Sequence, residues 1–271
     1  MLAAHDLRPK KRLGQNFLVD AAAARRIARL CVGDPPSDAP VLEIGAGTGT
    51  LTRALIEAGA AHLTALEIDP DLIAILRERK DLAGTTILES DALCFDYAAF
   101  APARPWRVAG NLPYNVATPL VTRLVEMDRG PEAMVVTVQR DVADRFAAVP
   151  GTRAYGSLSV AVQFAMHVHR AFTLSPRAFY PAPKVESTVV QLIRRDAPAV
   201  QPRDLRRFRE VVRAAFAYRR KTLANSLTLA LGLDRRRVEQ AILSAGIPSE
   251  QRGERLDLAD FARLADALAE G

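Results

Sequence analysis

The sequence has few of the residues that build metal centres and disulfide frameworks. Its 271 residues include two cysteines, Cys31 and Cys94, and four histidines, without the paired Cys and His spacing of a zinc site. The two cysteines lie far apart in the chain, so we expect neither a disulfide framework nor a bound metal. A reducing cytoplasm is the default location for a chain of this kind.

Long hydrophobic runs are also missing. Hydrophobic residues make up 49% of the chain, but charges or glycines interrupt every apolar stretch, whereas a membrane-spanning helix needs roughly 20 apolar residues. Residues 1–17 carry basic side chains with no apolar segment after them, which argues against a secretory signal. We therefore expect a cytoplasmic protein with no membrane partner.

Negative charge is the scarcer sign. The chain has 37 Lys and Arg against 31 Asp and Glu, which gives a formal net charge of +6. This excess suits a polyanionic partner, although an arginine-rich composition without a binding role is the alternative. The candidates for contact with RNA phosphates are Lys10, Lys11, Arg12, Arg219, Arg220 and Lys221. We expect the last three to begin a helix; a solvated helix face or a flexible arm is the other explanation for such runs.

Strand patterns alternate with helix patterns over the first 200 residues. Strands are predicted at 41–44, 62–68, 85–88, 134–138, 157–164, 167–173 and 187–193, and helices at 21–31, 51–58 and 118–126. Such alternation predicts an α/β fold, in which a parallel sheet has helices on both faces.

The pattern changes near residue 203. From there, apolar residues recur at helical spacing and no strand pattern follows, after a link marked by Pro198 and Pro202. We expect two domains: an α/β domain at residues 1–200, which includes a basic N-terminal arm, and a small helical domain at residues 201–271.

A glycine-rich turn follows the first predicted strand. Gly45, Gly47 and Gly49 lie between that strand and a helix, and glycines let a ligand approach the backbone closely. Glu67 and Asp91 lie at the ends of the next two strands. There, the first can accept hydrogen bonds from ribose hydroxyls and the second from an adenine amine. The G-x-G-x-G spacing favours S-adenosylmethionine over a nicotinamide cofactor or a plain turn.

A second motif, Asn111-Leu112-Pro113-Tyr114, ends another apolar run. The Asn111 side-chain oxygen and the Leu112 carbonyl can accept hydrogen bonds from the amino group of adenine, which exposes the lone pair of that nitrogen. Pro113 makes a rigid corner, and the Tyr114 ring can stack on the base. No histidine lies near the motif, and none is required, because the product ammonium can lose its proton after transfer. The base must be flipped out or single-stranded to enter such a pocket.

These motifs resemble those of the small-subunit ribosomal RNA adenine N6-dimethyltransferases, the family linked to kasugamycin sensitivity. The segments that carry the resemblance lie in family order, at residues 11–18, 42–49, 110–115, 154–160, 181–187 and 216–227. The resemblance implies a Rossmann-like S-adenosylmethionine methyltransferase domain with a small C-terminal helical domain. It also implies a monomer that acts on 16S rRNA in a precursor of the small ribosomal subunit. The implied targets are two adjacent adenosines of the 3′-terminal hairpin loop, each methylated twice.

The resemblance also implies a role for individual residues. The cofactor contacts implied in this way are Asn16, Leu18, Gly45, Glu67, Asp91 and Asn111. The residues implied for the catalytic pocket are Asn111, Leu112, Pro113 and Tyr114. Phe179 resembles a second aromatic that packs on the target base with Tyr114, and an ordinary core position is its other interpretation.

Three other functions fit part of the pattern. The macrolide-resistance enzymes, which dimethylate an adenine of 23S rRNA, share the glycine turn and a similar Asn-Pro-Tyr motif. The segments at 155–160 and 219–227, however, look more like the small-subunit enzymes. An inactive RNA-binding assembly factor is a second alternative, against which the intact site motifs argue, and a nicotinamide oxidoreductase is a third.

Overall fold

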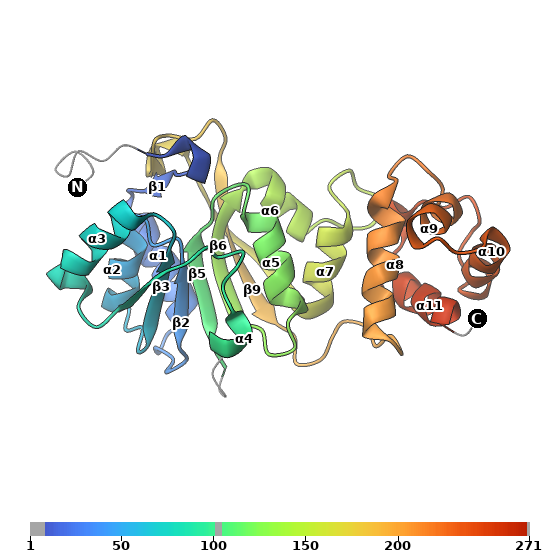
Figure 1. The fold of residues 1–271 in the computed structure, drawn as a ribbon, viewed down its shortest axis with the longest axis horizontal. Coiled ribbons are helices and arrows are strands. Elements are labelled where there is room, and N and C mark those ends of the chain that lie inside the picture. The colour runs from blue at the N-terminus through green and yellow to red at the C-terminus, as the bar shows by residue number, and fades with distance from the viewer. Residues whose placement is uncertain (1–8, 101–104, 270–271) are drawn as a thin grey trace. The chain divides into compact units, whose positions relative to one another are not determined.

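The computed structural model describes residues 9–100 and 105–269, apart from the side chain of Lys11 (Figure 1). Contacts divide the chain into two compact units. The sheet unit contains the residues up to Ala143 together with Val168–Arg194, and the helical unit contains Asp144–His167 together with the residues from Arg195 onward. The segment Asp144–His167 thus groups with the C-terminal helices, while a functional boundary at residue 200 stays a prediction.

A seven-stranded sheet forms the centre of the sheet unit. Its strands are β2 (Val41–Ile44), β3 (Leu63–Glu67), β4 (Thr86–Glu89), β5 (Arg107–Asn111), β6 (Ala133–Gln139), β7 (Met166–Leu174) and β9 (Ser187–Arg194). Across the sheet their order is β4-β3-β2-β5-β6-β9-β7. The strands predicted at 41–44, 62–68, 85–88, 134–138, 167–173 and 187–193 are therefore confirmed.

The sheet is mixed. The strands from β4 to β6 pair in parallel, as expected, but β9 pairs antiparallel with β6, so the prediction of a wholly parallel sheet is wrong. An antiparallel strand beside a run of parallel strands is common in large α/β sheets.

Helices cover both faces of the sheet, and the predicted helices at 21–31, 51–58 and 118–126 are confirmed. The helices of the sheet unit are α1 (Ala21–Val32), α2 (Thr50–Glu57), α3 (Pro70–Glu78), α4 (Tyr97–Phe100) and α5 (Ala117–Glu126). The connections β2-α2-β3 and β5-α5-β6 run in opposite directions across the sheet. Right-handed crossovers therefore place α2 and α5 on opposite faces.

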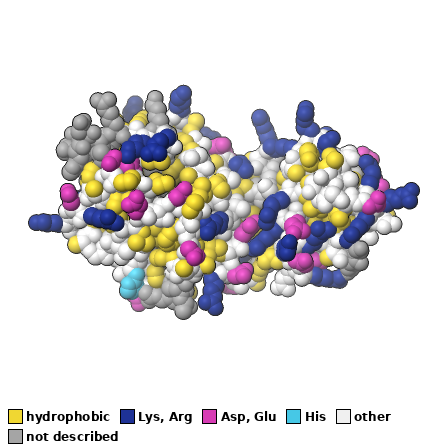
Figure 2. Space-filling model, viewed as in Figure 1, with side chains coloured by type: hydrophobic (Ala, Val, Ile, Leu, Met, Phe, Trp, Pro, Cys, Tyr) yellow, Lys and Arg dark blue, Asp and Glu magenta, His cyan; other side chains and the backbone are white. Residues whose placement is uncertain are grey.

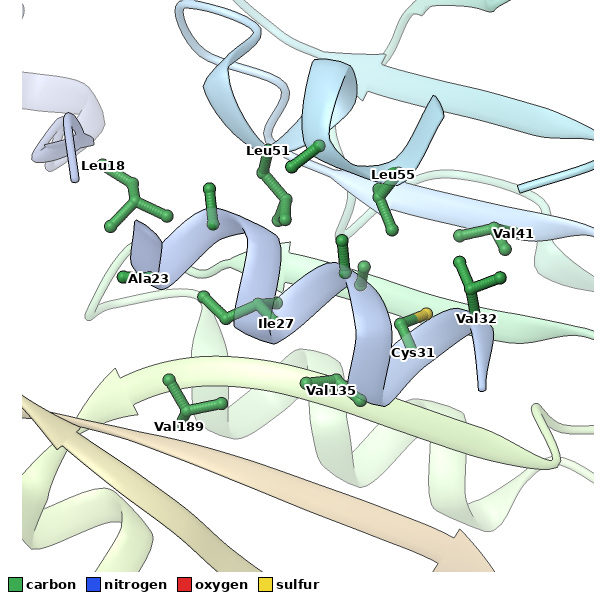
Figure 3. Close-up of a cluster of buried hydrophobic side chains, with 14 of the residues drawn as sticks. Leu18, Ala23, Ile27, Cys31, Val32, Val41, Leu51, Leu55, Val135 and Val189 are labelled. Carbon is green, nitrogen blue, oxygen red and sulfur yellow. The ribbon is translucent and has the colours of Figure 1, made fainter. Parts of the chain in front are cut away.

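The position of α1 is set by a cap and by its apolar face. The Asp20 carboxylate accepts hydrogen bonds from the backbone N–H groups of Ala22 (2.9 Å) and Ala23 (3.0 Å), as an N-cap residue does. Figure 3 shows the helix between α2, which carries Leu51 and Leu55, and the sheet strands that carry Val135 and Val189. Packing on both sides fixes this helix, and with it the segment of chain just before it.

Among the described residues of the helical unit, four α-helices follow residue 195 and one precedes it. They are α7 (Ser157–Ala165), α8 (Leu205–Ala217), α9 (Leu223–Leu231), α10 (Arg235–Ser244) and α11 (Leu258–Ala269), while α6 (Arg140–Phe146) crosses the division between the units. Nowhere in residues 9–100 and 105–269 does a helix combine the length and the apolar composition needed to cross a bilayer.

The strand predicted at 157–164 is wrong, since this segment forms α7. It is apolar on most sides, and periodicity alone cannot distinguish a continuous apolar run in a strand from one in a buried helix. The backbone N–H of Gly156 donates to Ser159 Oγ (3.1 Å), and this hydroxyl donates to the Arg145 carbonyl (2.6 Å). Phe164 then packs on Phe208, with ring centroids 5.0 Å apart. The turn at Gly156 and this packing select the helix.

The helix start predicted at Arg219, Arg220 and Lys221 is also wrong. These residues lie in the turn between α8 and α9, and α9 begins at Leu223. The backbone N–H of Tyr218 donates to the hydroxyl of Ser226 in α9 (3.3 Å), so the chain reverses here before the helix starts.

Candidate active site

The glycine turn connects β2 to α2 in a conformation that requires glycine. Gly45, Gly47 and Gly49 have φ angles of 77°, 56° and 76°, values that L-residues with a Cβ rarely adopt. A Cβ on Gly49 would lie 2.6 Å from Arg79 Nη1, and a Cβ on Gly47 would lie 3.0 Å from the Phe17 ring. The turn is therefore enclosed on both sides, and its backbone can lie directly against a ligand.

Glu67 ends β3 and holds this turn in place. Its Oε2 accepts from the backbone N–H of Gly47 (2.7 Å), and its Oε1 accepts from Ile68 N (2.9 Å) and Asp69 N (3.0 Å). Burial raises the pKa of the Glu67 carboxyl, and the three backbone donors oppose that shift. Oε1 already accepts two bonds but Oε2 accepts only one, so Oε2 can still accept from a ligand hydroxyl.

Asp91 lies just beyond the end of β4, on the same edge of the sheet. It is half-buried, and its Oδ1 accepts from the backbone N–H of Leu93 at 2.8 Å. The Glu67 and Asp91 carboxylates thus lie at the carboxyl ends of neighbouring parallel strands, where ligands bind in open α/β sheets.

The Asn-Leu-Pro-Tyr motif lies where β5 ends. Asn111 Nδ2 donates to the Asn16 carbonyl oxygen (2.7 Å), which leaves Oδ1 as the acceptor of the same amide. The Leu112 backbone N–H donates to the Thr137 carbonyl on β6 (3.1 Å). Tyr114 Oη lies 3.5 Å from Ser187 Oγ. Bonds to the N-terminal segment, to β6 and to β9 thus hold the corner rigid.

A two-stranded antiparallel sheet covers the cavity from the N-terminal side. It pairs β1 (Phe17–Leu18) with β8 (Phe179–Tyr180), so that Leu18 lies opposite Phe179. The backbone N–H of Val19 also donates to the Ala178 carbonyl (2.9 Å). Segments about 160 residues apart in the sequence thereby meet beside the Asn111 motif.

Together these elements enclose a cavity of about 240 Å³. All predicted cofactor, catalytic and base-contacting residues line it: Asn16, Leu18, Gly45, Glu67, Asp91, Asn111, Leu112, Pro113, Tyr114 and Phe179. Phe179 is only 4% exposed, so it is both a core residue and a wall of the cavity. In the described part of the chain, no group of three His, Cys, Asp or Glu side chains could hold a metal.

The predicted phosphate contacts belong to both units. Arg12 lines the mouth of the cavity and is exposed. Lys10, by contrast, forms ion pairs with Asp69 (2.6 Å) and Asp71 (2.7 Å), so a phosphate would have to compete with two carboxylates. The Lys11 side chain lies outside the described part of the structure. Arg219, Arg220 and Lys221 belong to the helical unit.

The bonds that hold the N-terminal segment over the cavity were not predicted from the sequence. Gln15 Nε2 donates to Asp69 Oδ2 (2.9 Å), and Gln15 Oε1 accepts from the Lys10 backbone N–H (2.7 Å). Asp69 is also the N-cap of α3, where its Oδ1 accepts from the backbone N–H of Asp71 (3.2 Å). Its bond to Gln15, by contrast, joins chain segments more than 50 residues apart.

Glu43, under the glycine turn, gives a testable pH dependence. Its side chain is fully buried, and among the described residues no hydrogen bond of good geometry reaches its oxygens, although the neighbouring Thr52 hydroxyl favours the charged form. Burial raises the pKa of its carboxyl from 4.5 to about 8. Because the pKa is higher in the folded state, the proton bound to Glu43 contributes fully to the free energy of unfolding below pH 4.5. This contribution is lost as the pH rises to about 8.

We therefore expect the free energy of unfolding of the Glu43→Gln variant, relative to wild type, to increase as the pH rises from 5 to 8. The slope of this difference should be about 1.4 kcal/mol per pH unit. Urea unfolding of both proteins at pH 5, 6, 7 and 8 measures it, since all other titrating groups cancel in the difference. A flat difference would show that Glu43 is not protonated in the fold.

Comparisons with known proteins identify relatives over nearly the whole chain. The family model described as ribosomal RNA adenine dimethylase matches residues 7–270. The ribosomal RNA small subunit methyltransferase A of Magnetococcus marinus is 44% identical over 98% of this chain and 94% of its own length. The protein of the same name from Streptococcus gordonii is 40% identical over 99% of this chain and 94% of its own length.

Solved structures agree with this assignment. The 23S rRNA methyltransferase ErmE is 28% identical, with a TM-score of 0.67 over 94% of this chain and 100% of its own. A dimethyladenosine transferase from Plasmodium falciparum, 22% identical, shares the fold with a TM-score of 0.70 over 90% of this chain and 93% of its own. The predicted Rossmann-like methyltransferase fold with a helical C-terminal part is thus confirmed.

Proposed function

This chain belongs to the ribosomal RNA adenine dimethylase family, and from this premise we propose that it dimethylates two adjacent adenosines in the 3′-terminal hairpin loop of 16S rRNA. Family membership makes it an S-adenosylmethionine-dependent rRNA adenine dimethyltransferase rather than a nicotinamide oxidoreductase. The observation that supports the finer proposal is the single cavity in which Glu67, Asp91 and Asn111 meet.

The residues that would hold S-adenosylmethionine fit its chemistry. Glu67 offers carboxylate oxygens to ribose hydroxyls, Asp91 offers one to an adenine amine, and the glycine turn lets the cofactor lie against the backbone. We further propose that Asn16 and Leu18 contact the cofactor from the N-terminal segment. The bound group supplies an activated methyl on a sulfonium.

The protein's own residues orient the target amine. Asn111 Oδ1 and the Leu112 carbonyl accept hydrogen bonds from the adenine N–H groups, which directs the nitrogen lone pair away from the ring plane. Tyr114 and Phe179 hold the flipped base by stacking and packing, a contribution of roughly 1–3 kcal/mol for a stacked base. Orientation of this kind is a large part of catalysis when no strong base is needed.

Sequence identity favours the small-subunit RNA as substrate. The small-subunit enzymes of M. marinus and S. gordonii are 44% and 40% identical to this chain, against 28% for the 23S enzyme ErmE. We therefore propose a precursor of the small ribosomal subunit as the partner. We further propose that the chain acts as a monomer in the cytoplasm, without a metal, with residues 1–200 as the methyltransferase domain and 201–271 as the helical domain.

We propose RNA phosphate contacts at the turn between α8 and α9. Arg219, Arg220 and Lys221 are exposed there, although Arg219 also donates to the Arg153 carbonyl and lies 3.7 Å from Glu254. Figure 2 shows Lys and Arg side chains, with Asp and Glu among them, on the face of the helical unit that is in view. Lys10, Lys11 and Arg12 are a second proposed contact, of which Arg12 lines the cavity mouth.

Replacing Arg219, Arg220 and Lys221 with Ala should weaken RNA binding and flatten its salt dependence. Each lost phosphate contact removes about 0.7 to 0.9 from the slope of log K against log salt, so we expect the slope to fall by about 2. Filter binding at several salt concentrations measures this. Arg206→Ala, which removes an exposed arginine paired with Glu210 on α8, is the control and should change the slope less. An unchanged slope in the triple variant would contradict the contact.

Mass spectrometry of rRNA fragments tests the proposed substrate. Unmethylated small-subunit particles and 23S rRNA are incubated separately with the enzyme and S-adenosylmethionine. We expect two adjacent dimethyladenosines in the 3′-terminal hairpin fragment of 16S rRNA and none in 23S rRNA. Methylation of 23S rRNA alone would indicate the macrolide-resistance activity, and methylation of neither RNA would indicate an inactive assembly factor.

A further inference from the structure

The loop between β4 and α4 carries Asp91, and local hydrogen bonds turn the chain around this residue. Asp91 Oδ1 accepts from the backbone N–H of Leu93 (2.8 Å), and the Asp91 carbonyl accepts from Cys94 N and Phe95 N (both 2.9 Å). The donors that hold Asp91 thus belong to its own segment: three backbone N–H groups and the hydroxyl of Ser90, whose Oγ lies 3.4 Å from the Asp91 carbonyl oxygen. Each of these N–H groups lies in a planar peptide unit with the carbonyl of the preceding residue. The direction of the N–H therefore depends on the group that holds this carbonyl.

The first of these carbonyls is held by a buried tyrosine. The Ala92 carbonyl belongs to the same peptide unit as Leu93 N, and it accepts from Tyr97 Oη at 2.8 Å. Tyr97 is 1% exposed, and its ring is stacked with that of Trp106, with centroids 6.4 Å apart and 16° between the planes. The unit that donates to the Asp91 carboxylate is therefore anchored to the core.

The second carbonyl is held by an arginine on another element. The Leu93 carbonyl shares a peptide unit with Cys94 N, and it accepts from Arg123 Nη1 at 2.7 Å. The guanidinium carbon of Arg123 also lies 5.0 Å from the centroid of the Tyr97 ring, within the range of a cation–π contact. Arg123 lies on α5, the helix that starts at Ala117, shortly after Tyr114.

We propose that Arg123 is a positioning residue that, with Tyr97, orients Asp91 and so makes the cofactor site selective for an adenine ring. This proposal rests on the proposed function, because it takes Asp91 as the acceptor of the adenine amine. With both peptide units fixed, Oδ1 stays on Leu93 N and Oδ2 keeps one direction toward the cavity. Without the arginine, the unit containing the Leu93 carbonyl can rotate, and Asp91 loses that direction.

Calorimetric titration with two ligands tests the proposal. S-adenosylhomocysteine carries the purine amine, and S-inosylhomocysteine has a carbonyl oxygen in its place, which would face the Asp91 carboxylate. A site built to accept from the amine should prefer the adenine ligand, and we expect a preference of about 10-fold or more in wild type. We expect this preference to fall below about 3-fold in Arg123→Met, mainly through weaker binding of the adenine ligand.

Two further variants keep the test valid if Arg123→Met is unstable. Arg123→Lys retains a donor and should recover part of the preference, whereas Tyr97→Phe keeps the ring but loses the bond to Ala92 and should lower it. The matched control is Arg77→Met, since Arg77 is also exposed on a helix and its Nη2 lies 3.5 Å from a backbone carbonyl, that of Ile87. Arg77→Met should leave the preference unchanged.

Each result has a distinct meaning. Equal weakening of both ligands by Arg123→Met would indicate a merely structural role and overturn the proposal, and so would an unchanged preference in Arg123→Met and Tyr97→Phe. If wild type showed no preference, the contact between Asp91 and adenine would itself be wrong, and the proposal would fail with it. Methylation of 16S rRNA by wild type, measured separately, tests the proposed function in every case.

Discussion

Replacing Asn111 with Ala should reduce methyl transfer by about 1,000-fold or to below detection, while the affinity for S-adenosylhomocysteine changes by no more than about 3-fold. The variant removes the side-chain oxygen that accepts from the target amine. The main proposed cofactor contacts, Glu67 and Asp91, come from other strands and keep their own backbone bonds. Single-turnover transfer of a tritiated methyl group to 16S rRNA, together with calorimetry, measures the two quantities.

The orientation of the Asn111 amide allows a sharper variant. Its Nδ2 donates to the Asn16 carbonyl at 2.7 Å. In Asn111→Asp a carboxylate oxygen would face that carbonyl, so the variant keeps an acceptor but loses the bond that aims it. We expect activity as low as that of the alanine variant, because position rather than the mere presence of an acceptor is decisive.

Asn115→Ala is the control for both variants, since Asn115 is an exposed asparagine that lines the same cavity outside the catalytic corner. It should retain transfer within a few-fold of wild type. Normal dimethylation by Asn111→Ala would show that another group accepts from the amine. A loss of cofactor affinity as large as the loss of rate would show that Asn111 mainly holds the cofactor.

The residues of the cavity could be predicted where their chemistry is local in the sequence. Gly45, Glu67, Asp91 and Asn111 each follow a recognisable strand, and parallel strands bring their carboxyl ends to one edge. That single rule placed four separate motifs around one cavity, and the structure brings them together there. The proposed variants and ligand titrations test whether Glu67, Asp91 and Asn111 make their proposed contacts.

The enclosure of the cavity could not be predicted from local patterns. Each of the strands β1 and β8 has two residues, which is too short for any periodicity, and their pairing joins Leu18 to Phe179 across most of the chain. The bonds from Lys10 and Gln15 to Asp69 also join segments that are far apart in the sequence. The RNA contact at Lys10 stays a prediction, but the pairing of its ammonium with two carboxylates could not be read from the sequence.

The wrong secondary-structure predictions have a similar cause. In both segments a serine hydroxyl accepts from a backbone N–H group: Ser159 from Gly156 at the start of α7, and Ser226 from Tyr218 in the turn before α9. A serine in a sequence does not reveal its partner. Apolar spacing predicts strands and helices correctly where burial of one face determines the local structure. It fails where hydrogen bonds and packing outside that pattern determine it.

Replacing Glu67 with Gln should lower both the stability of the fold and the affinity for the cofactor. Both carboxylate oxygens accept from backbone N–H groups, one from Gly47 and the other from Ile68 and Asp69. In either orientation, the amide NH₂ of a glutamine would face at least one of these donors. Each buried donor left without an acceptor costs about 1–3 kcal/mol, so we expect a loss of about 2–4 kcal/mol in the free energy of unfolding.

The same variant should lower the affinity for S-adenosylhomocysteine by about 100-fold, because the glycine turn loses its anchor at Gly47 and the ribose loses a charged acceptor. Urea unfolding and calorimetry measure the two effects. The control is Glu89→Gln: Glu89 lies opposite Glu67 in the register of β3 and β4, but its side chain is exposed, so both quantities should stay near wild type. If Glu67→Gln lost stability yet bound the ligand normally, Glu67 would be a support for the turn alone, and the ribose would have to find its acceptor elsewhere in the cavity.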